Sequence, residues 1–404
     1  MLVAQTQPKR ILWIGNSYTT VNNLPLLFHD LALSSGDTVI YDSNALGGYT
    51  FQQHTLNTAT IQKIYSQPWD YVILQAQSQE PSFPPAQVES QTYPYAHILD
   101  SIIRDNDSCT ETIFYMTWGK KYGDQMNCNG YPVLCSFDGV QSRLTDSYLQ
   151  MANDNQALVA PVGRAWQTSW HTDTLIDLWD ADNSHPNVAG SYLTACVFYG
   201  TIFRKSPVGI MYSPISAQTT NTYLQNIAYH TVFDTLSKWN IGVFDVLADF
   251  DFTGNEATKT FSFNNWSQNS TSYEWNFGDG NTSTTTGVHT YNDTGTYSVS
   301  LIVFDYCGRS DTSSHLIHIN RANEINSIEN KAVTIYPNPA KADFTISDIP
   351  VSALNSWMQI TDVQGRVVLT YKILNQNSSI QSDILTPGIY LLKLDSKVYR
   401  LIKL

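Results

Sequence analysis

Basic residues are scarce in this sequence of 404 residues, where 22 Lys and Arg stand against 35 Asp and Glu and give a formal net charge of −13. A chain with this balance repels phosphate backbones and anionic lipid headgroups, which argues against a nucleic-acid or membrane-surface partner. Charged residues make up only 14% of the chain, well below the roughly 25% of an average domain. The remaining polarity comes from Asn, Gln, Ser and Thr, with 24 Tyr and 10 Trp, a composition typical of extracellular proteins that face glycans.

Long apolar runs are also absent from the sequence. No stretch reaches the about 18 apolar residues that a transmembrane helix needs, so none is expected. The start of the chain lacks the basic residues and the apolar stretch of a signal peptide. Residues 1–4 resemble the last residues of one, and we interpret them either as the stub of a truncated signal peptide or as an ordinary disordered terminus.

Cysteine is infrequent, with five in the chain. Cys128 and Cys135 enclose a loop that is short enough to be closed by a disulfide in an oxidising compartment. A metal site is the alternative, although no Cys or His pair lies beside them at ligand spacing. We expect no metal and no other cofactor. Cys196 lies among apolar residues and is predicted to be a small buried side chain and not a nucleophile.

Three segments of different texture follow one another along the chain. Residues 8–235 alternate short apolar runs with longer stretches of helical period, which indicates a parallel sheet covered by helices on both faces. Residues 243–320 contain short strands of period 2 and turns with Gly and Asp, which predict a β-sandwich. Residues 320–327 are polar and aperiodic, as in a linker. Residues 328–404 alternate apolar and polar positions again, which predicts a second all-β module.

A serine follows the first apolar strand directly. This strand, at residues 11–14, leads into Gly-Asn-Ser at 15–17, and a helical pattern begins after Pro25. A serine between the carboxyl end of a strand and the next helix lies where α/β sheets bind ligands, beside backbone N–H groups that can stabilise an anion. Ser17 is therefore a candidate nucleophile, and an ordinary turn is the alternative interpretation.

A second candidate group lies near the end of the first segment. Asp182 precedes His185 by three residues, and Pro186 follows at the opening of a helix predicted at 188–203. A serine nucleophile needs an imidazole base that a carboxylate holds in one tautomer, and Asp182 can reach His185 within one turn. The alternative is that Asp182 or Asn183 caps the helix while His185 is a surface residue.

Together the two motifs resemble the first and last blocks of the SGNH/GDSL hydrolase superfamily, Gly-Asp-Ser and Asp-x-x-His, with Asn16 in place of the usual Asp. The resemblance covers about residues 10–205. It implies a three-layer α/β/α, flavodoxin-like domain in which Ser17, His185 and Asp182 form a catalytic triad.

The resemblance also implies an oxyanion hole. In the second block Gly48 is the best match, and its N–H would act with that of Ser17, whereas a flexible turn is the alternative. The third block is usually Gly-x-Asn-Asp, but Gln-Ala-Gln-Ser-Gln follows the strand here. Aligned from the strand, Gln79 takes the place of the oxyanion Asn, and Gln75 and Gln77 are alternatives because strand ends are uncertain by a residue or two. This pattern is similar to a carbohydrate-esterase-like branch of the superfamily.

Residues on the substrate side are harder to identify. Trp118 ends the strand that begins near residue 112, and we expect it at the rim of the same face, where it could stack on a sugar ring. Packing beneath the following loop is the alternative. The loop at 119–138 is long enough to form a wall or a lid.

The second segment resembles a PKD domain. It contains Glu-Trp-Asn-Phe-Gly-Asp-Gly at 274–280 and His-Thr-Tyr at 289–291, and the resemblance implies an immunoglobulin-like sandwich. Its aspartates could hold Ca²⁺, but turn formation is the better explanation for them. This module carries no catalytic arrangement.

The third segment resembles the C-terminal sorting domain of type IX secretion cargo. Tyr-Pro-Asn-Pro at 336–339, Gly-Arg at 365–366 and Pro-Gly-Ile-Tyr at 387–390 carry the resemblance. It implies a secreted or cell-surface protein whose partner is the secretion machinery.

We therefore expect a secreted serine esterase that transfers an acyl group to Ser17 and then to water. The polar, Trp-rich composition favours an O-acetylated carbohydrate over a lipid as the substrate. Two alternatives stay open: a lipase-like esterase on the same fold, and a glycan-binding adhesion protein without turnover, which the atypical third block would suit.

Overall fold

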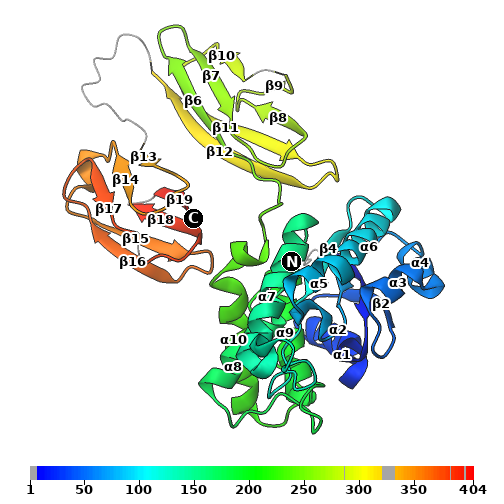
Figure 1. Ribbon diagram of the computed structural model, residues 1–404. Helices are drawn as coiled ribbons and strands as arrows, with labels where there is room; N and C mark the ends of the chain where they lie inside the picture. Colours follow the sequence, from blue (N-terminus) through cyan, green and yellow to red (C-terminus); the bar gives the residue numbers. More distant parts are fainter. Residues whose placement is uncertain (1–6, 286, 321–332, 383, 395–396) are drawn as a thin grey trace. The chain divides into compact units, whose positions relative to one another are not determined.

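The computed structural model describes residues 7–285, 287–320, 333–382, 384–394 and 397–404 (Figure 1). The possible signal-peptide stub and most of the expected linker lie outside these residues. The chain divides into compact units after Ile241. Trp239 and Ile241 belong to the hydrophobic core of the first unit, so this unit extends past the helix that ends at Phe233.

A parallel sheet of five strands, in the order β2-β1-β3-β4-β5, forms the centre of the first unit. The strands are β1 (Lys9–Gly15), β2 (Val39–Ala45), β3 (Tyr71–Leu74), β4 (Glu111–Tyr115) and β5 (Leu158–Ala160). All residues of β3 are buried, as its continuous apolar run predicts for a strand covered on both faces. Because parallel strands end at one edge of the sheet, the turns that follow β1 and β3 lie side by side.

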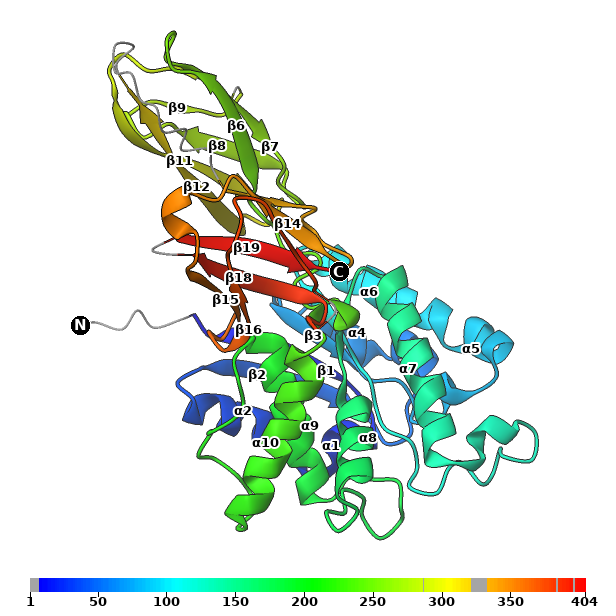
Figure 2. The same ribbon diagram turned by 90° about the vertical axis from the view of Figure 1, so that its left-hand side faces the viewer.

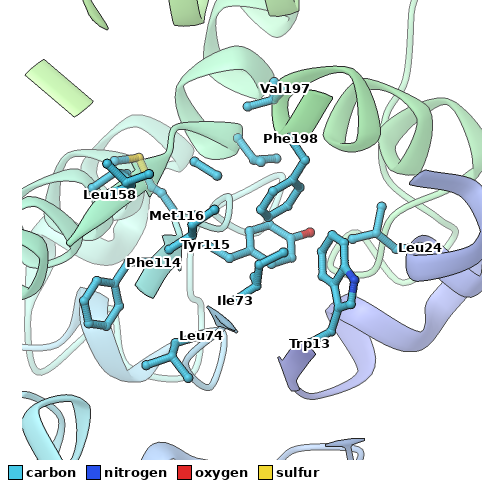
Figure 3. Packing of buried hydrophobic residues seen from close by; sticks show 14 of the residues in the cluster. Trp13, Leu24, Ile73, Leu74, Phe114, Tyr115, Met116, Leu158, Val197 and Phe198 are labelled. Carbon is cyan, nitrogen blue, oxygen red and sulfur yellow. The ribbon is translucent and has the colours of Figure 1, made fainter. Parts of the chain in front are cut away.

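Helices lie on both faces of this sheet. Phe114 of β4 packs against Phe51, with ring centroids 6.4 Å apart, while the next residue, Tyr115, packs against Phe198 at 5.0 Å. Successive side chains of a strand point to opposite faces, so the helices that carry Phe51 and Phe198 cover different faces. Figure 3 shows Tyr115, Phe198 and Trp13 together on one side of this packing. The expected three-layer α/β/α architecture is confirmed.

The helices fall into groups that pack against one another. Figure 2 shows α2, α9 and α10 close together, and α2 and α10 both contact α9. The helices of the first unit are α1 (Ser17–Thr20), α2 (Leu24–Ser34), α3 (Phe51–Leu56), α4 (Thr58–Ile64), α5 (Pro85–Gln91), α6 (Tyr93–Asn106), α7 (Phe137–Asp154), α8 (Val162–Thr172), α9 (Val188–Phe203) and α10 (Gln218–Phe233). Short 3-10 turns are η1 (Val21–Asn23), η2 (Glu80–Ser82), η3 (Pro132–Cys135) and η4 (Leu236–Trp239).

The second segment is a sandwich of two antiparallel sheets, in the orders β10-β7-β6 and β12-β11-β8-β9. Phe263 of one sheet packs against Trp275 of the other, with ring centroids 5.5 Å apart, inside a separate hydrophobic core. The strands are β6 (Phe250–Asn255), β7 (Thr260–Asn265), β8 (Ser272–Asn276), β9 (Thr282–Ser283), β10 (Val288–Thr290), β11 (Gly295–Phe304) and β12 (Ser310–Ile319).

The third segment is again all-β, with sheets β13-β14-β17 and β16-β15-β18-β19. Phe344 and Ile360, which belong to different sheets, share its core. The strands are β13 (Thr334–Tyr336), β14 (Phe344–Ser347), β15 (Trp357–Asp362), β16 (Val367–Lys372), β17 (Ser378–Ile380), β18 (Gly388–Leu394) and β19 (Lys397–Lys403), and η5 (Val351–Ala353) is a short turn between them.

The cysteines follow the sequence expectations. Cys128 and Cys135 form a disulfide, with Cα atoms 4.8 Å apart. Cys196 is a fully buried free thiol in α9, and burial raises its pKa to about 12, so it is not an activated nucleophile. Within the described ranges, no helix is both long and apolar enough to span a bilayer.

Candidate active site

Ser17, His185 and Asp182 form a continuous chain of hydrogen bonds. Ser17 begins α1 directly after β1, and its Oγ lies 2.9 Å from Nε2 of His185. The other ring nitrogen of His185, Nδ1, lies 2.5 Å from Oδ2 of Asp182. A carboxylate can only accept hydrogen bonds, so Nδ1 of His185 must carry the proton that it donates to Asp182. In the neutral ring, Nε2 then has no proton and can accept a hydrogen bond from the hydroxyl of Ser17. The order Ser–His–Asp is the geometry of an activated nucleophile.

The loop before α9 gives Asp182 a fixed orientation. Its Oδ1 accepts hydrogen bonds from the N–H groups of Ser184 and His185, both at 2.9 Å. Asn183 adopts φ of +59°, a left-handed conformation that Asn tolerates and that turns the chain back. Burial raises the pKa of the Asp182 carboxyl, but hydrogen bonds from the His185 ring and from the two N–H groups outweigh it and lower the pKa. The carboxylate therefore remains charged beside the imidazole.

Asn16 connects the turns that follow β1, β2 and β3. Its Nδ2 donates to the carbonyl oxygens of Tyr49 at 3.2 Å and Ala76 at 3.4 Å, and its Oδ1 accepts from the N–H of Tyr18 at 3.1 Å. The residue is only 2% exposed. A carboxylate of Asp at this position could not donate to the two carbonyl oxygens and would repel them. These contacts therefore explain why Asn replaces the Asp of the Gly-Asp-Ser block.

Gly48 and Ser17, whose backbone N–H groups are the expected oxyanion donors, have different backbone surroundings. Gly48 has φ of +72°, and no atom lies within 4 Å of the place where a Cβ would be. The glycine is needed for its backbone conformation and not for close packing. The N–H of Ser17 opens α1, where no intrahelical acceptor exists, and among the described residues we find no acceptor for it.

The three glutamines after β3 make different contacts. Gln75 is fully buried, and its Oε1 accepts from the Asn16 N–H at 2.8 Å while its Nε2 donates to the Ala76 carbonyl at 2.5 Å. A Cβ on Gly15 would lie 2.6 Å from the same Oε1, so this packing requires glycine there. These contacts give Gln75 a structural role.

Gln77 and Gln79 are each half-buried. Oε1 of Gln77 accepts from the N–H groups of Gln79 at 2.7 Å and Glu80 at 3.1 Å, which closes the turn that leads into η2. Nε2 of Gln79 donates to Oδ2 of Asp124 at 2.9 Å. One amide N–H of Gln79 is therefore engaged with the loop that follows β4.

Trp118 does not lie at the rim, and the expectation that it stacks on a sugar ring is wrong. It is 1% exposed, and both faces of its indole are covered, by Tyr18 at 4.7 Å and by Trp166 at 3.8 Å, with interplanar angles of 6° and 2°. Its Nε1 donates to the carbonyl oxygen of Ser184 at 2.9 Å. The side chain supports the loop of His185 from below and cannot reach a ligand.

The loop after β4 is fastened at several points. Asp124 is 1% exposed and accepts from Asn127 at 2.6 Å as well as from Gln79. Burial raises the pKa of its carboxyl, but hydrogen bonds, first that of Asn127, outweigh burial and lower it. The N–H of Lys121 donates to the carbonyl oxygen of Asn183, next to the catalytic candidates. Together with the disulfide, these contacts hold the loop in place.

His54 supports the site and was not identified from the sequence. Its Nε2 donates to the Gly15 carbonyl at 2.8 Å, and its Nδ1 lies 2.9 Å from Oγ1 of Thr60, which also accepts from Asn44 at 2.7 Å. Burial lowers the pKa of His54, so the ring stays neutral. No spacing or motif distinguishes this histidine from one in a core, because its partners come from separate elements.

In the described part of the chain, no group of three or more His, Cys, Asp and Glu side chains is arranged to hold a metal ion.

Comparison with known proteins identifies the two β segments. Residues 247–319 match the family model of the PKD domain, and residues 334–403 match that of the secretion system C-terminal sorting domain. No curated protein matches the chain.

Three solved structures are each similar to about half of this chain. A DUF4886 family protein from Bacteroides uniformis is 18% identical with a TM-score of 0.48, over 56% of this chain and 95% of its own. A protein from Slackia heliotrinireducens that is assigned to the SGNH hydrolases is 26% identical with a TM-score of 0.40, over 48% and 99%. A mutant of an acetyl-xylooligosaccharide esterase from Geobacillus is 14% identical with a TM-score of 0.37, over 49% and 95%. The chain thus carries a PKD domain and a secretion system C-terminal sorting domain after its α/β unit, and it is a secreted or cell-surface protein.

Proposed function

We propose that the first domain is a serine ester hydrolase in which Ser17 is the nucleophile, His185 the general base and Asp182 the group that orients the base. The observation that carries this proposal is the 2.9 Å contact between Ser17 Oγ and His185 Nε2, in a ring whose Nδ1 is bonded to Asp182. Three side chains from two distant parts of the sequence meet in the order that nucleophilic catalysis requires.

The proposed reaction has two acyl-transfer steps. His185 Nε2 takes the proton of Ser17 as Oγ attacks the ester carbonyl, and the protonated ring then gives this proton to the leaving alcohol. Asp182 stabilises the imidazolium between these events. Water, deprotonated by the same nitrogen, attacks the acyl-enzyme; the bond between the acyl carbon and Ser17 Oγ then breaks, the imidazolium returns its proton to Oγ, and the acid leaves. The N–H groups of Ser17 and Gly48 stabilise the oxyanion in both steps.

We infer that the side-chain donor of the oxyanion hole is Gln77. Gln75 uses its amide in buried contacts, and Gln79 directs an N–H to Asp124. The carbonyl oxygen of Gln77 is held by two backbone N–H groups, and we find no acceptor for its NH₂ group among the described residues, so this group is available to a ligand. Gln79 remains the alternative, because an amide nitrogen has a second N–H.

The substrate that we propose is an O-acetylated carbohydrate. The support is the secreted location given by the sorting domain and the weakly charged, polar composition. Trp118 does not support this choice, because its side chain is enclosed in the core. Lipase-like turnover and glycan binding without turnover are the alternatives that the experiment separates.

The test compares the full chain with its Ser17→Ala variant on acetyl and long-chain p-nitrophenyl esters and on acetylated xylan or pectin. We expect acetate release by the wild type only, with a loss of several orders of magnitude in kcat for Ser17→Ala at unchanged circular dichroism. Faster turnover of long-chain esters would favour the lipase-like alternative. Binding of the polysaccharide without acetate release would favour the adhesion protein.

A further inference from the structure

We propose that Tyr18 is a positioning residue, whose phenol hydroxyl holds the loop of Asp182 and His185 in place against the nucleophile; this inference rests on the proposed esterase function. Tyr18 follows Ser17 in α1, and its hydroxyl lies 2.7 Å from Oγ of Ser184, the residue immediately before His185. One side chain therefore connects the nucleophile's helix directly with the loop that carries the base.

Ser184 is held at both of its oxygen atoms. Its Oγ pairs with the Tyr18 hydroxyl, and its carbonyl oxygen accepts from Nε1 of Trp118 at 2.9 Å. The two aromatic rings that make these bonds are themselves stacked, at 4.7 Å and 6°. Since Ser184 lies between Asp182 and His185, this grip fixes the segment that sets the distance between carboxylate and imidazole.

The ring of Tyr18 also limits the position of the imidazole. It packs edge to face against His185, with ring centroids 5.4 Å apart, and it is 2% exposed. The backbone N–H of Tyr18 is bonded to the Asn16 side chain, so the residue is held independently of His185. The phenol thus has little freedom of its own, which is what a positioning group requires.

The hydroxyl stays protonated over the working range of a hydrolase. Burial raises the pKa of Tyr18 to about 12, and hydrogen bonding to Ser184 and Ser78 only partly opposes this shift. The phenol is therefore a neutral partner at any pH at which His185 acts as a base, and it takes no part in proton transfer.

The test uses Tyr18→Phe, which keeps the ring and its stack, Ser184→Ala, which removes the other partner, and the double variant, all in the full chain. We expect each single variant to lower kcat on p-nitrophenyl acetate about tenfold at nearly constant KM, because the contact aligns groups and binds no substrate. The double variant should be no slower than the slower single variant, since both lose the same bond.

Tyr192→Phe is the matched control for loss of a buried phenol. Tyr192 lies in α9, and its hydroxyl contacts Gln225 at 2.8 Å and the Tyr212 carbonyl at 3.2 Å. The Tyr192→Phe variant should lower the melting temperature as much as Tyr18→Phe does, but it should leave kcat unchanged. If Tyr18→Phe does not fold, as circular dichroism would reveal, Ser184→Ala against the control carries the test.

A second readout separates this inference from the proposed function. The rate of covalent labelling of Ser17 by a fluorophosphonate reports the Ser17–His185 pair without ester turnover, and it should fall about tenfold in both single variants. Labelling of a wild type that hydrolyses no ester would overturn the function and leave the positioning role testable. The positioning role would be overturned if both single variants kept the kcat and the labelling rate of the wild type. It would also be overturned if the losses of the two single variants multiplied in the double variant.

Discussion

Replacement of Glu80 by Gln should change the pH dependence of stability in a direction that the structure fixes. Glu80 begins η2, and its Oε2 is buried without a hydrogen-bond partner among the described residues. Burial raises the pKa of this carboxyl from its ordinary 4.5 to about 7. The folded protein therefore favours the protonated form, and the charged form costs free energy.

Proton linkage gives the sign and the size of the effect of Glu80 on the free energy of unfolding. The pKa is raised on folding, so the contribution of Glu80 to stability is fully present below pH 4.5 and is lost as the pH rises through about 7. The complete shift would correspond to about 3 kcal/mol. Because part of the side chain faces solvent, we expect roughly half of this, about 1.5 kcal/mol.

The assay is urea unfolding of wild type and Glu80→Gln at pH 4 and pH 8, followed by near-ultraviolet circular dichroism. Gln resembles the protonated acid, so the variant should match the wild type at pH 4 and exceed its free energy of unfolding at pH 8 by about 1.5 kcal/mol. Glu89→Gln, at an exposed position in α5, is the control and should show no such difference. An equal effect of Glu80→Gln at both pH values would refute the reasoning, since the carboxyl would then be paired.

Three further predictions concern the site and the domain boundary. Asn16→Asp should lower the free energy of unfolding by about 2–4 kcal/mol at pH 8, measured by denaturant titration, because a buried carboxylate would face two carbonyl oxygens; an unchanged midpoint would contradict this. Gln77→Ala should lower kcat by about 10²–10³ with little change in KM. A larger loss in Gln79→Ala would move the donor to that residue, and kcat within threefold in both would leave only backbone donors. Removal of residues 243–404 should leave kcat on p-nitrophenyl acetate unchanged, because the core of the first unit ends at Ile241; a folded but inactive fragment would contradict this.

The sequence predicts the parallel sheet and the α/β/α layers because apolar runs and helical periods alternate strongly in the first segment. The proximity of Ser17 to His185 is expected for a different reason: the two motifs resemble the terminal blocks of one superfamily, and strand ends of a parallel sheet meet at one edge. The spacing of apolar residues does not predict where side chains point beyond the last residue of a strand. The Trp118 prediction failed there, since its orientation depends on Tyr18 and Trp166 from other elements.

The roles of the glutamines show a related limit. Counting from the end of β3 favours Gln79, but the chain turns after Gln77, whose Oε1 accepts the N–H groups that open η2. A side chain forms this turn, so the pattern of apolar residues in the sequence does not predict it. The partner of Gln79, Asp124, lies in a loop whose path depends on a disulfide and on buried hydrogen bonds. Contacts between two loops of this kind require the folded structure.

The central claim is that Ser17 forms an acyl-enzyme, and trapping this intermediate tests it most directly. The full chain is mixed with p-nitrophenyl acetate, quenched in acid within its first turnover, digested and examined by mass spectrometry. We predict one additional acetyl group on the peptide that contains Ser17, with a burst of one p-nitrophenol per enzyme, and neither in Ser17→Ala. Hydrolysis at the wild-type rate with no acetylated Ser17, or with the acetyl group on another residue, would contradict the account.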